Sequence, residues 1–148
     1  MKANGRIAVD TNAVIAYRAG DSEACRLIKS AKVILVPAPV VGELVFGALN
    51  SQRIEENKIA VQKFLTYSMF VRIDENVTNR YASVRYKLRK AGRPIPENDL
   101  WIAAVCLEFD VPLLTGDAHF ENVDRLKVIN WTIKQSLQSQ EDVGEIII

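Results

Sequence analysis

Four acidic residues lie beside apolar stretches, where carboxylates could take part in chemistry; they are Asp10, Glu43, Asp99 and Asp117. Two carboxylates about 4 Å apart repel each other by roughly 4 kcal/mol at an effective dielectric constant of about 20, so a cluster of them requires a positive partner. Carboxylate oxygens suit a hard cation such as Mg²⁺ or Mn²⁺. Such an ion can activate bound water and neutralise charge on phosphate oxygens, so hydrolysis of a phosphodiester fits this set.

Each of these acids also has an ordinary structural interpretation. Asp99 could cap a helix or complement its dipole, although Asn98 is the expected cap. Asp10 and Asp117 could stabilise turns through their side chains. Glu43 is surrounded in the sequence by valine, leucine and phenylalanine, so we expect it to be buried, which would be costly without a partner. The four acids indicate chemistry only when they are considered together.

The elements that must position these acids alternate along the chain. Short apolar runs typical of buried strands occur at 6–9, 33–36, 69–73, 111–114 and 126–129. Segments with helical spacing separate them, and one helix is expected to begin after an Asp21 cap and another to end at Gly92. This order predicts an α/β fold, a three-layer α/β/α sandwich with a parallel five-stranded sheet.

The predicted topology brings the four acids to one edge of the sheet. Asp10 and Asp117 directly follow strands, and Glu43 lies in the opening turns of a helix that follows a strand. Asp99 opens a helix that leads into the fourth strand, and this helix must also begin at the carboxyl edge. Open α/β sheets bind their ligands at that edge, so we expect a metal site there.

Polar neighbours could support the acids. Asn12 and Thr115 could hydrogen-bond the carboxylates or metal-bound water, although both also suit turns. In the basic segment at 79–93, Arg85, Arg89 and Arg93 are candidates for binding phosphate, while a solvated helix face explains the segment equally well. His119 is the single histidine, and its place beside an apolar strand indicates a packed or hydrogen-bonded ring; we do not assign it to the site.

Composition excludes several classes of protein. The chain has 148 residues, 49% of them hydrophobic, and a formal net charge of +1, so no global field attracts nucleic acid. Cys25 and Cys106 lie in apolar stretches, which favours buried thiols in a reducing compartment. Without a signal-like or membrane-spanning run, the prediction is a cytoplasmic protein with no membrane contact. We predict a domain over residues 1–133 and a polar tail over 134–148, either docked or loose.

The stretches that carry the acids resemble those of PIN-domain ribonucleases, specifically VapC-type toxins of toxin–antitoxin pairs. They are VDTNAVIAY, PVVGELVFGA, PENDLWIAA and LLTGDAHF, in that order between residues 6 and 131. The resemblance implies endonucleolytic cleavage of RNA that leaves a 5′-phosphate and a 3′-hydroxyl. It also implies Mg²⁺ or Mn²⁺ at Asp10, Glu43, Asp99 and Asp117, a homodimer, and a cognate antitoxin that covers the acidic groove.

Other readings of the acids remain open. A receiver-type phosphoacceptor domain also carries acids at the carboxyl edge of an α/β sheet. That class needs an aspartate after a strand, an adjacent pair of acids earlier in the chain and a lysine after a late strand. Here VDTN offers a single acid, and no such lysine follows VPLL. A haloacid-dehalogenase-type phosphatase would have a second aspartate where this chain has Asn12. An inactive PIN-like binding module is the third alternative, and the presence of all four acids argues against it.

Overall fold

The computed structural model describes residues 5–132 and has a parallel sheet of five strands in the order β3-β2-β1-β4-β5. The strands are β1 (Arg6–Val9), β2 (Val33–Pro37), β3 (Met69–Val71), β4 (Leu113–Thr115) and β5 (Val128–Asn130). The predicted α/β sandwich with a five-stranded parallel sheet is therefore confirmed. Each of the five apolar runs contributes a strand, with shifts of one to two residues at several ends.

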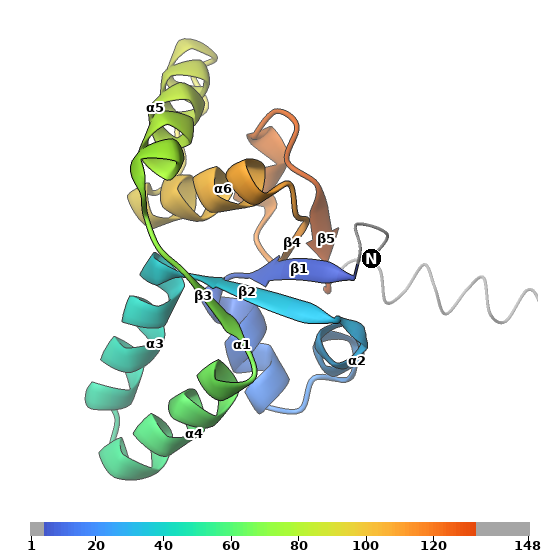
Figure 1. The fold of residues 1–148 in the computed structure, drawn as a ribbon, viewed down its shortest axis with the longest axis vertical. Helices are drawn as coiled ribbons and strands as arrows, with labels where there is room; N and C mark the ends of the chain where they lie inside the picture. The colour runs from blue at the N-terminus through green and yellow to red at the C-terminus, as the bar shows by residue number, and fades with distance from the viewer. Residues whose placement is uncertain (1–4, 133–148) are drawn as a thin grey trace, which may run out of the picture.

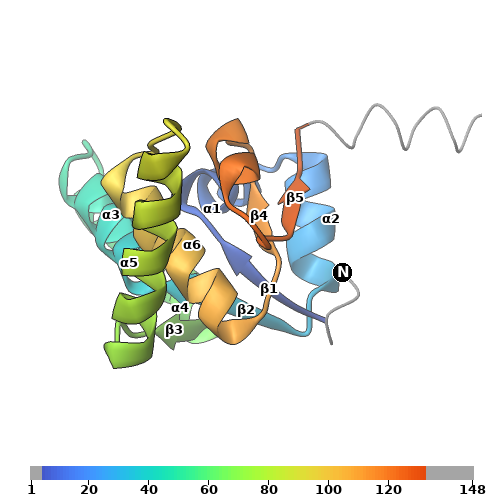
Figure 2. The same cartoon turned by 90° about the horizontal axis from the view of Figure 1, so that it is seen from above.

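Helices cover both faces of the sheet (Figure 1). They are α1 (Thr11–Arg18), α2 (Ser22–Ser30), α3 (Ala38–Leu49), α4 (Ile54–Thr66), α5 (Glu75–Lys90) and α6 (Glu97–Phe109), followed by the short 3₁₀ helix η1 (Ala118–Asn122). In Figure 1, α5 and α6 lie above the sheet, while α1, α2, α3 and α4 lie below it. Figure 2 shows α5 and α6 packed beside each other over the strands. The sheet is therefore the middle layer of three.

The core is built around the central strands. Residues Ile7, Ala8 and Val9 of β1 are fully buried, as are Leu113 and Leu114 of β4. Both strands have neighbours on each side in the sheet and helices on each face, which explains why their sequences are apolar without alternation. The register pairs Val9 with Leu114, so the residues that follow these two strands emerge next to each other.

Two of the expected helix boundaries are confirmed and one is wrong. The Asp21 side chain accepts a hydrogen bond from Ala24 N–H and caps α2, and Gly92 follows α5 with a left-handed φ of 70°. Helix α6 begins at Glu97 with Pro96 at the N-cap, so Asn98 lies inside the first turn and does not cap it. Asp99 lies in this same first turn, where its charge complements the helix dipole.

The remaining expectations concern compartments and the end of the chain. Within residues 5–132, the helices are too short or too polar to cross a bilayer. Cys106 is buried, Cys25 is partly buried, and both are free thiols. The cytoplasmic location stays a prediction. The predicted polar tail, 134–148, lies outside the described residues.

Candidate active site

Asp10 lies where β1 passes into α1, with 5% of its surface exposed. Its Oδ1 accepts a hydrogen bond from Ala13 N–H at 2.8 Å, so the side chain caps α1. Its Oδ2 accepts a hydrogen bond from Thr115 Oγ1 at 2.5 Å. The carboxylate thus caps a helix and is also held at the sheet edge, and the structural and functional interpretations of this residue are compatible.

Thr115 connects two of the predicted acids. It ends β4, is fully buried, and donates its hydroxyl hydrogen to Asp10. The same hydroxyl oxygen accepts a hydrogen bond from Asp117 N–H at 3.0 Å. Because β1 and β4 are neighbours in the sheet, this chain of hydrogen bonds fixes the backbone before Asp117 relative to Asp10. The predicted supporting position of Thr115 beside the acids agrees with this geometry.

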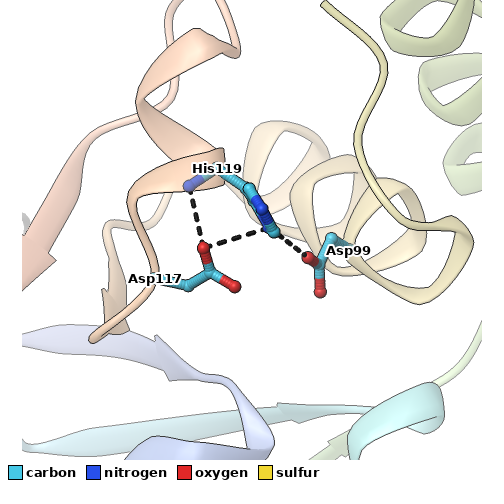
Figure 3. Close-up of side chains that lie close together, drawn as sticks. All are labelled: Asp99, Asp117 and His119. Carbon is cyan, nitrogen blue, oxygen red and sulfur yellow. Dashed lines mark hydrogen bonds and ion pairs between the residues drawn. The ribbon is translucent and has the colours of Figure 1, made fainter.

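Asp99 and Asp117 lie close together with a third residue, His119 (Figure 3). His119 Nδ1 lies 3.0 Å from Asp117 Oδ1 and 3.5 Å from Asp99 Oδ2. One potential ligand atom from each of the three residues lies within 4.8 Å of those from the other two. The side chains come from α6 and from the segment that follows β4, so the fold brings together residues about 20 positions apart.

The sequence analysis left His119 out of the site, and the structure places it there. The signal was a histidine two residues after an acid that follows a strand, which is a weak pattern by itself. The contact between His119 and Asp117 depends on the 3₁₀ helix η1, whose first turn brings His119 back toward Asp117. The backbone N–H of His119 donates a hydrogen bond to Asp117 Oδ1 at 2.9 Å.

Burial and neighbouring charges both act on the acids. Burial raises the pKa of Asp10, and the charges of Asp99 and Asp117 raise it further, while hydrogen bonds from Thr115 and Ala13 lower it. Burial also raises the pKa of Asp99; the charges of Asp117 and Glu43 add to the increase, and His119 opposes it. The negative charges are thus close enough to affect one another, and a cation among them would relieve the repulsion.

Glu43 lies near the other acids, but the reason given for singling it out is wrong. It is exposed, because the apolar residues around it in the sequence divide between the buried side of α3 and its open side. Its charge still raises the pKa of Asp99. Glu43 lines a hollow of about 190 Å³ with Thr11, whose buried Oγ1 has no hydrogen-bond partner within residues 5–132.

Asn12, the other predicted supporting residue, is exposed in the first turn of α1. It lines an open hollow of about 590 Å³ whose wall includes Asp117, Gly116 and Trp131. Asn12 thus lies beside one acid of the site, and its supporting role stays a prediction.

The three arginines predicted to contact phosphate lie around α5 and the turn after it. Arg85 donates a hydrogen bond to Tyr81 Oη at 2.8 Å and lies 4.0 Å from Glu97. Arg89 lines a hollow of about 360 Å³ with Arg85. Arg93 contacts Asn122 Oδ1 at 3.5 Å, at the far end of η1 from Asp117. Arg85 and Arg89 therefore lie beside the start of α6, which carries Asp99, and Arg93 lies beside the end of η1, which carries His119.

The donor set fits a divalent cation. Asp99 and Asp117 offer carboxylate oxygens, His119 offers an imidazole nitrogen, and Asp10 lies within electrostatic reach of both acids. The Asp99 side chain is about one fifth exposed and the His119 side chain about one half, so solvent and ions can reach them. The arrangement can hold a cation and present it to a phosphate at the carboxyl edge of the sheet.

Comparison with known proteins identifies relatives along most of the chain. A family model described as PIN domain matches residues 7–126. Ribonuclease VapC1 of Haemophilus influenzae (strain R2866) is 32% identical over 91 residues, which is 61% of this chain and 68% of the relative. Ribonuclease VapC4 of Mycobacterium tuberculosis is 32% identical over 99 residues, 64% of this chain and 74% of the relative.

Solved structures share the fold over nearly their whole length. One is a crystal structure of VapBC2 from Rickettsia felis bound to a DNA fragment from the promoter of these proteins. It superposes with a TM-score of 0.78 at 26% identity and covers 85% of this chain and 98% of that chain. VapBC-1 from nontypeable Haemophilus influenzae superposes with a TM-score of 0.76 at 26% identity, covering 86% and 98%. The resemblance seen in the sequence is therefore matched in three dimensions.

Proposed function

The chain belongs to the PIN domain family, and from this membership we propose that it is an endoribonuclease, the toxin of a toxin–antitoxin pair, whose chemistry takes place at the acidic edge of the sheet. Relatives with similar sequences are ribonucleases by name, and similar solved structures include VapBC proteins. The activity, the substrate and the partner follow from this likeness together with the site geometry.

One observation supports the proposal most strongly. Asp10, Asp99 and Asp117 come from distant parts of the chain, yet the charges of Asp99 and Asp117 add to the rise that burial causes in the pKa of Asp10, and the charge of Asp117 adds to the rise at Asp99. A structural role would not require such crowding, because a helix cap or a turn needs one acid. Perturbed carboxylates gathered at the ligand-binding edge of an α/β sheet are typical of a catalytic site.

Asp99 and Asp117 would hold the divalent ion, Asp10 would complete its surroundings from the buried side, and Glu43 would face it from the exposed side. When bound, Mg²⁺ or Mn²⁺ supplies a positive charge that activates water and neutralises the phosphate. Thr115 positions Asp10 by donating a hydrogen bond to one of its oxygens, and α1 fixes the other oxygen through Ala13 N–H. The site is thus held rigid before substrate arrives.

In the proposed hydrolysis, water is the attacking group and the 3′-oxygen is the leaving group. The oxygen of a water molecule forms a bond to phosphorus, the bond from phosphorus to the 3′-oxygen breaks, and that oxygen takes up a proton. The products are a 5′-phosphate and a 3′-hydroxyl. The Asp99 and Asp117 side chains are about one fifth and one third exposed, so the RNA backbone would approach them from solvent.

Arg85, Arg89 and Arg93 would bind phosphates of the RNA away from the cleaved bond. They lie on α5 and in the turn that leads to α6, the helix that carries Asp99, and their long side chains could reach a backbone that crosses the acidic edge. Because Arg85 already contacts Tyr81 and lies near Glu97, it must exchange these contacts for phosphate. The contribution of each arginine is therefore expected to be modest.

The proposed partners are a cognate antitoxin and a second copy of the chain. VapBC structures similar to this one at 26% identity are the basis for the antitoxin. Growth arrest on expression, relieved by the product of the neighbouring reading frame, would support the toxin assignment. Size measured by light scattering would test the homodimer.

The alternatives considered from sequence are less favoured. The family match is to a PIN domain, not to a receiver or a haloacid dehalogenase. An inactive PIN-like module would not need to keep the acids crowded at the carboxyl edge. If the purified chain fails to cut any RNA with either metal, the inactive module becomes the better description.

The direct test is cleavage of RNA by the purified chain with Mg²⁺ or Mn²⁺, stopped by EDTA. Asp99→Asn should remove cleavage while the circular dichroism spectrum stays unchanged. Asp124→Asn, an exposed acid in the turn after η1, is the matched control and should cut at the wild-type rate. Equal cleavage by wild type and Asp99→Asn would refute the assignment.

A further inference from the structure

We propose that His119 is a nitrogen ligand of the divalent ion, so that the site of this chain binds Mn²⁺ more tightly than Mg²⁺. The inference rests on the proposed function, because it concerns the ion that the nuclease would use. It goes beyond that function by assigning a new ligand and a metal preference. The carboxylates alone indicate neither.

The spacing of the three side chains supports ligation. Atoms that occupy adjacent positions around an octahedral ion, each about 2.1 Å from it, lie roughly 3.0 Å apart. His119 Nδ1 lies 3.0 Å from Asp117 Oδ1 and 3.5 Å from Asp99 Oδ2. Without large movement, the imidazole nitrogen and the two carboxylates can therefore share one ion.

The backbone holds His119 in this place. Its N–H donates a hydrogen bond to Asp117 Oδ1 within η1, so the position of the histidine is tied to that of the acid. Figure 3 shows the ring lying between Asp99 and Asp117, with one edge toward both carboxylates. A histidine with a purely packing role would have its ring among apolar side chains, whereas half of this side chain is exposed.

The position of Glu43 strengthens the argument. The sequence predicted four acidic ligands, yet the group of close ligand atoms within residues 5–132 consists of Asp99, Asp117 and His119. Glu43 is exposed on α3 and outside this group. An imidazole in the group adds a donor without adding negative charge, which avoids the repulsion that a further carboxylate would bring.

The chemistry of the donors sets the metal preference. Carboxylate oxygens suit both Mg²⁺ and Mn²⁺, whereas imidazole nitrogen favours transition-metal ions over Mg²⁺. A mixed site of two carboxylates and one imidazole is therefore expected to discriminate between the two ions. An all-carboxylate site would discriminate much less.

A hydrogen bond is the competing explanation of the same distances. If Nδ1 carries a proton, a spacing of 3.0 Å to Asp117 is that of an ordinary N–H···O contact. In that case His119 only orients the acids, and the bound ion sees oxygen ligands alone. Detection of nitrogen in the coordination shell separates the two explanations.

The experiment is pulsed electron paramagnetic resonance on the full, tag-free chain loaded with Mn²⁺. Because the chain has a single histidine, an imidazole nitrogen coupled to Mn²⁺ can come only from His119. We expect this coupling in the wild type and its loss in His119→Asn, whose amide can keep a hydrogen bond near the Nδ1 position. Titration should show Mn²⁺ affinity falling about tenfold or more in this variant, while Mg²⁺ affinity changes less than about twofold.

The outcomes also separate this inference from the proposed function. Mn²⁺ bound without imidazole coupling, or a coupling that persists in His119→Asn, would overturn the inference and leave the carboxylate site standing. Mn²⁺ affinity that is unchanged in Asp99→Asn would overturn the proposed metal site as well. Asp124→Asn should keep both the coupling and the wild-type affinity.

Discussion

The acidic edge of the sheet and the arginine-rich hairpin of α5 and α6 are built in different ways. Asp10 and Thr115 are buried and are joined by a hydrogen bond between the ends of the neighbouring strands β1 and β4, and Asp10 also caps α1. Arg85 and Arg89 are exposed, and Arg85 is held by contacts with Tyr81 and Glu97 on the surface. Core packing therefore fixes Asp10 and Thr115 at the acidic edge, whereas the arginines of the hairpin are long side chains whose surface contacts can be exchanged.

This difference indicates which substitutions should affect cleavage and which should affect RNA binding. A change at Asp10 or Thr115 alters atoms that have little freedom to compensate, because both residues are buried against the packed core. A change on the hairpin removes one of several charges that act through solvent, where salt screens them. We therefore expect large effects on cleavage from the first region and graded effects on RNA affinity from the second.

The largest effect is expected from the acids. Asp99→Asn and Asp10→Asn should each lower the rate of RNA cleavage by more than about a hundredfold, above the loss typical for residues that only support a metal site. Single-turnover cleavage of a labelled RNA in Mn²⁺ measures this loss. If either variant retained more than a tenth of the activity, the acidic edge would not be the reactive region.

The next effect is expected at Thr115, which has no contact with substrate in the proposed mechanism. Thr115→Val leaves Asp10 Oδ2 and Asp117 N–H without their buried partner, and should cost about 1–3 kcal/mol of unfolding free energy. Cleavage should fall by roughly 10- to 100-fold. Urea denaturation and cleavage assays measure the two losses.

Thr115→Ser is the matched control, because it keeps the hydroxyl group. It should retain most of the activity. Equal loss in the valine and serine variants would show that packing by the methyl group, and not the hydrogen bonds, is what Thr115 contributes.

A smaller effect is expected on the hairpin. Replacing Arg85, Arg89 and Arg93 with Gln one at a time should weaken RNA binding by a few-fold to about tenfold, and should reduce the salt dependence of binding by roughly one unit of slope for each lost phosphate contact. The cleavage rate at saturating RNA should stay the same. A variant that lost rate without losing affinity would move that arginine from the binding surface to the reactive site.

The smallest effect is expected in stability without metal. Burial and neighbouring charges raise the pKa of Asp99, so the folded chain binds this proton more tightly than the unfolded chain does. The resulting penalty is fully present above the raised pKa and disappears as the pH falls toward the ordinary value of 3.8. Asp99→Asn should therefore gain stability relative to wild type as the pH rises from 4 to 7, by no more than a few degrees in Tm.

Thermal denaturation in EDTA measures this trend, with Asp124→Asn as the control for loss of an exposed charge. A stability difference between Asp99→Asn and wild type that did not change with pH would contradict the raised pKa of Asp99.

The sequence was sufficient to predict the order of strands and helices along the chain and the sheet edge on which the acids lie. Buried parallel strands leave a clear apolar pattern, and parallel topology fixes where Asp10 and Asp117 emerge. The burial of Glu43 could not be predicted, because α3 is apolar on more than one side and the pattern does not tell which side faces the core. The contact of His119 could not be predicted either, since it depends on the turn geometry of η1. Asn98 was wrongly expected to cap α6, because the helix already begins at Glu97, with Pro96 at its N-cap.

The most direct test is anomalous diffraction from a crystal of the full chain soaked in Mn²⁺. We predict one or more manganese peaks at coordinating distance from the carboxylates of Asp99 and Asp117, with the Asp10 carboxylate facing the same ion. A well-ordered crystal with these carboxylates accessible and no manganese among them would contradict the account.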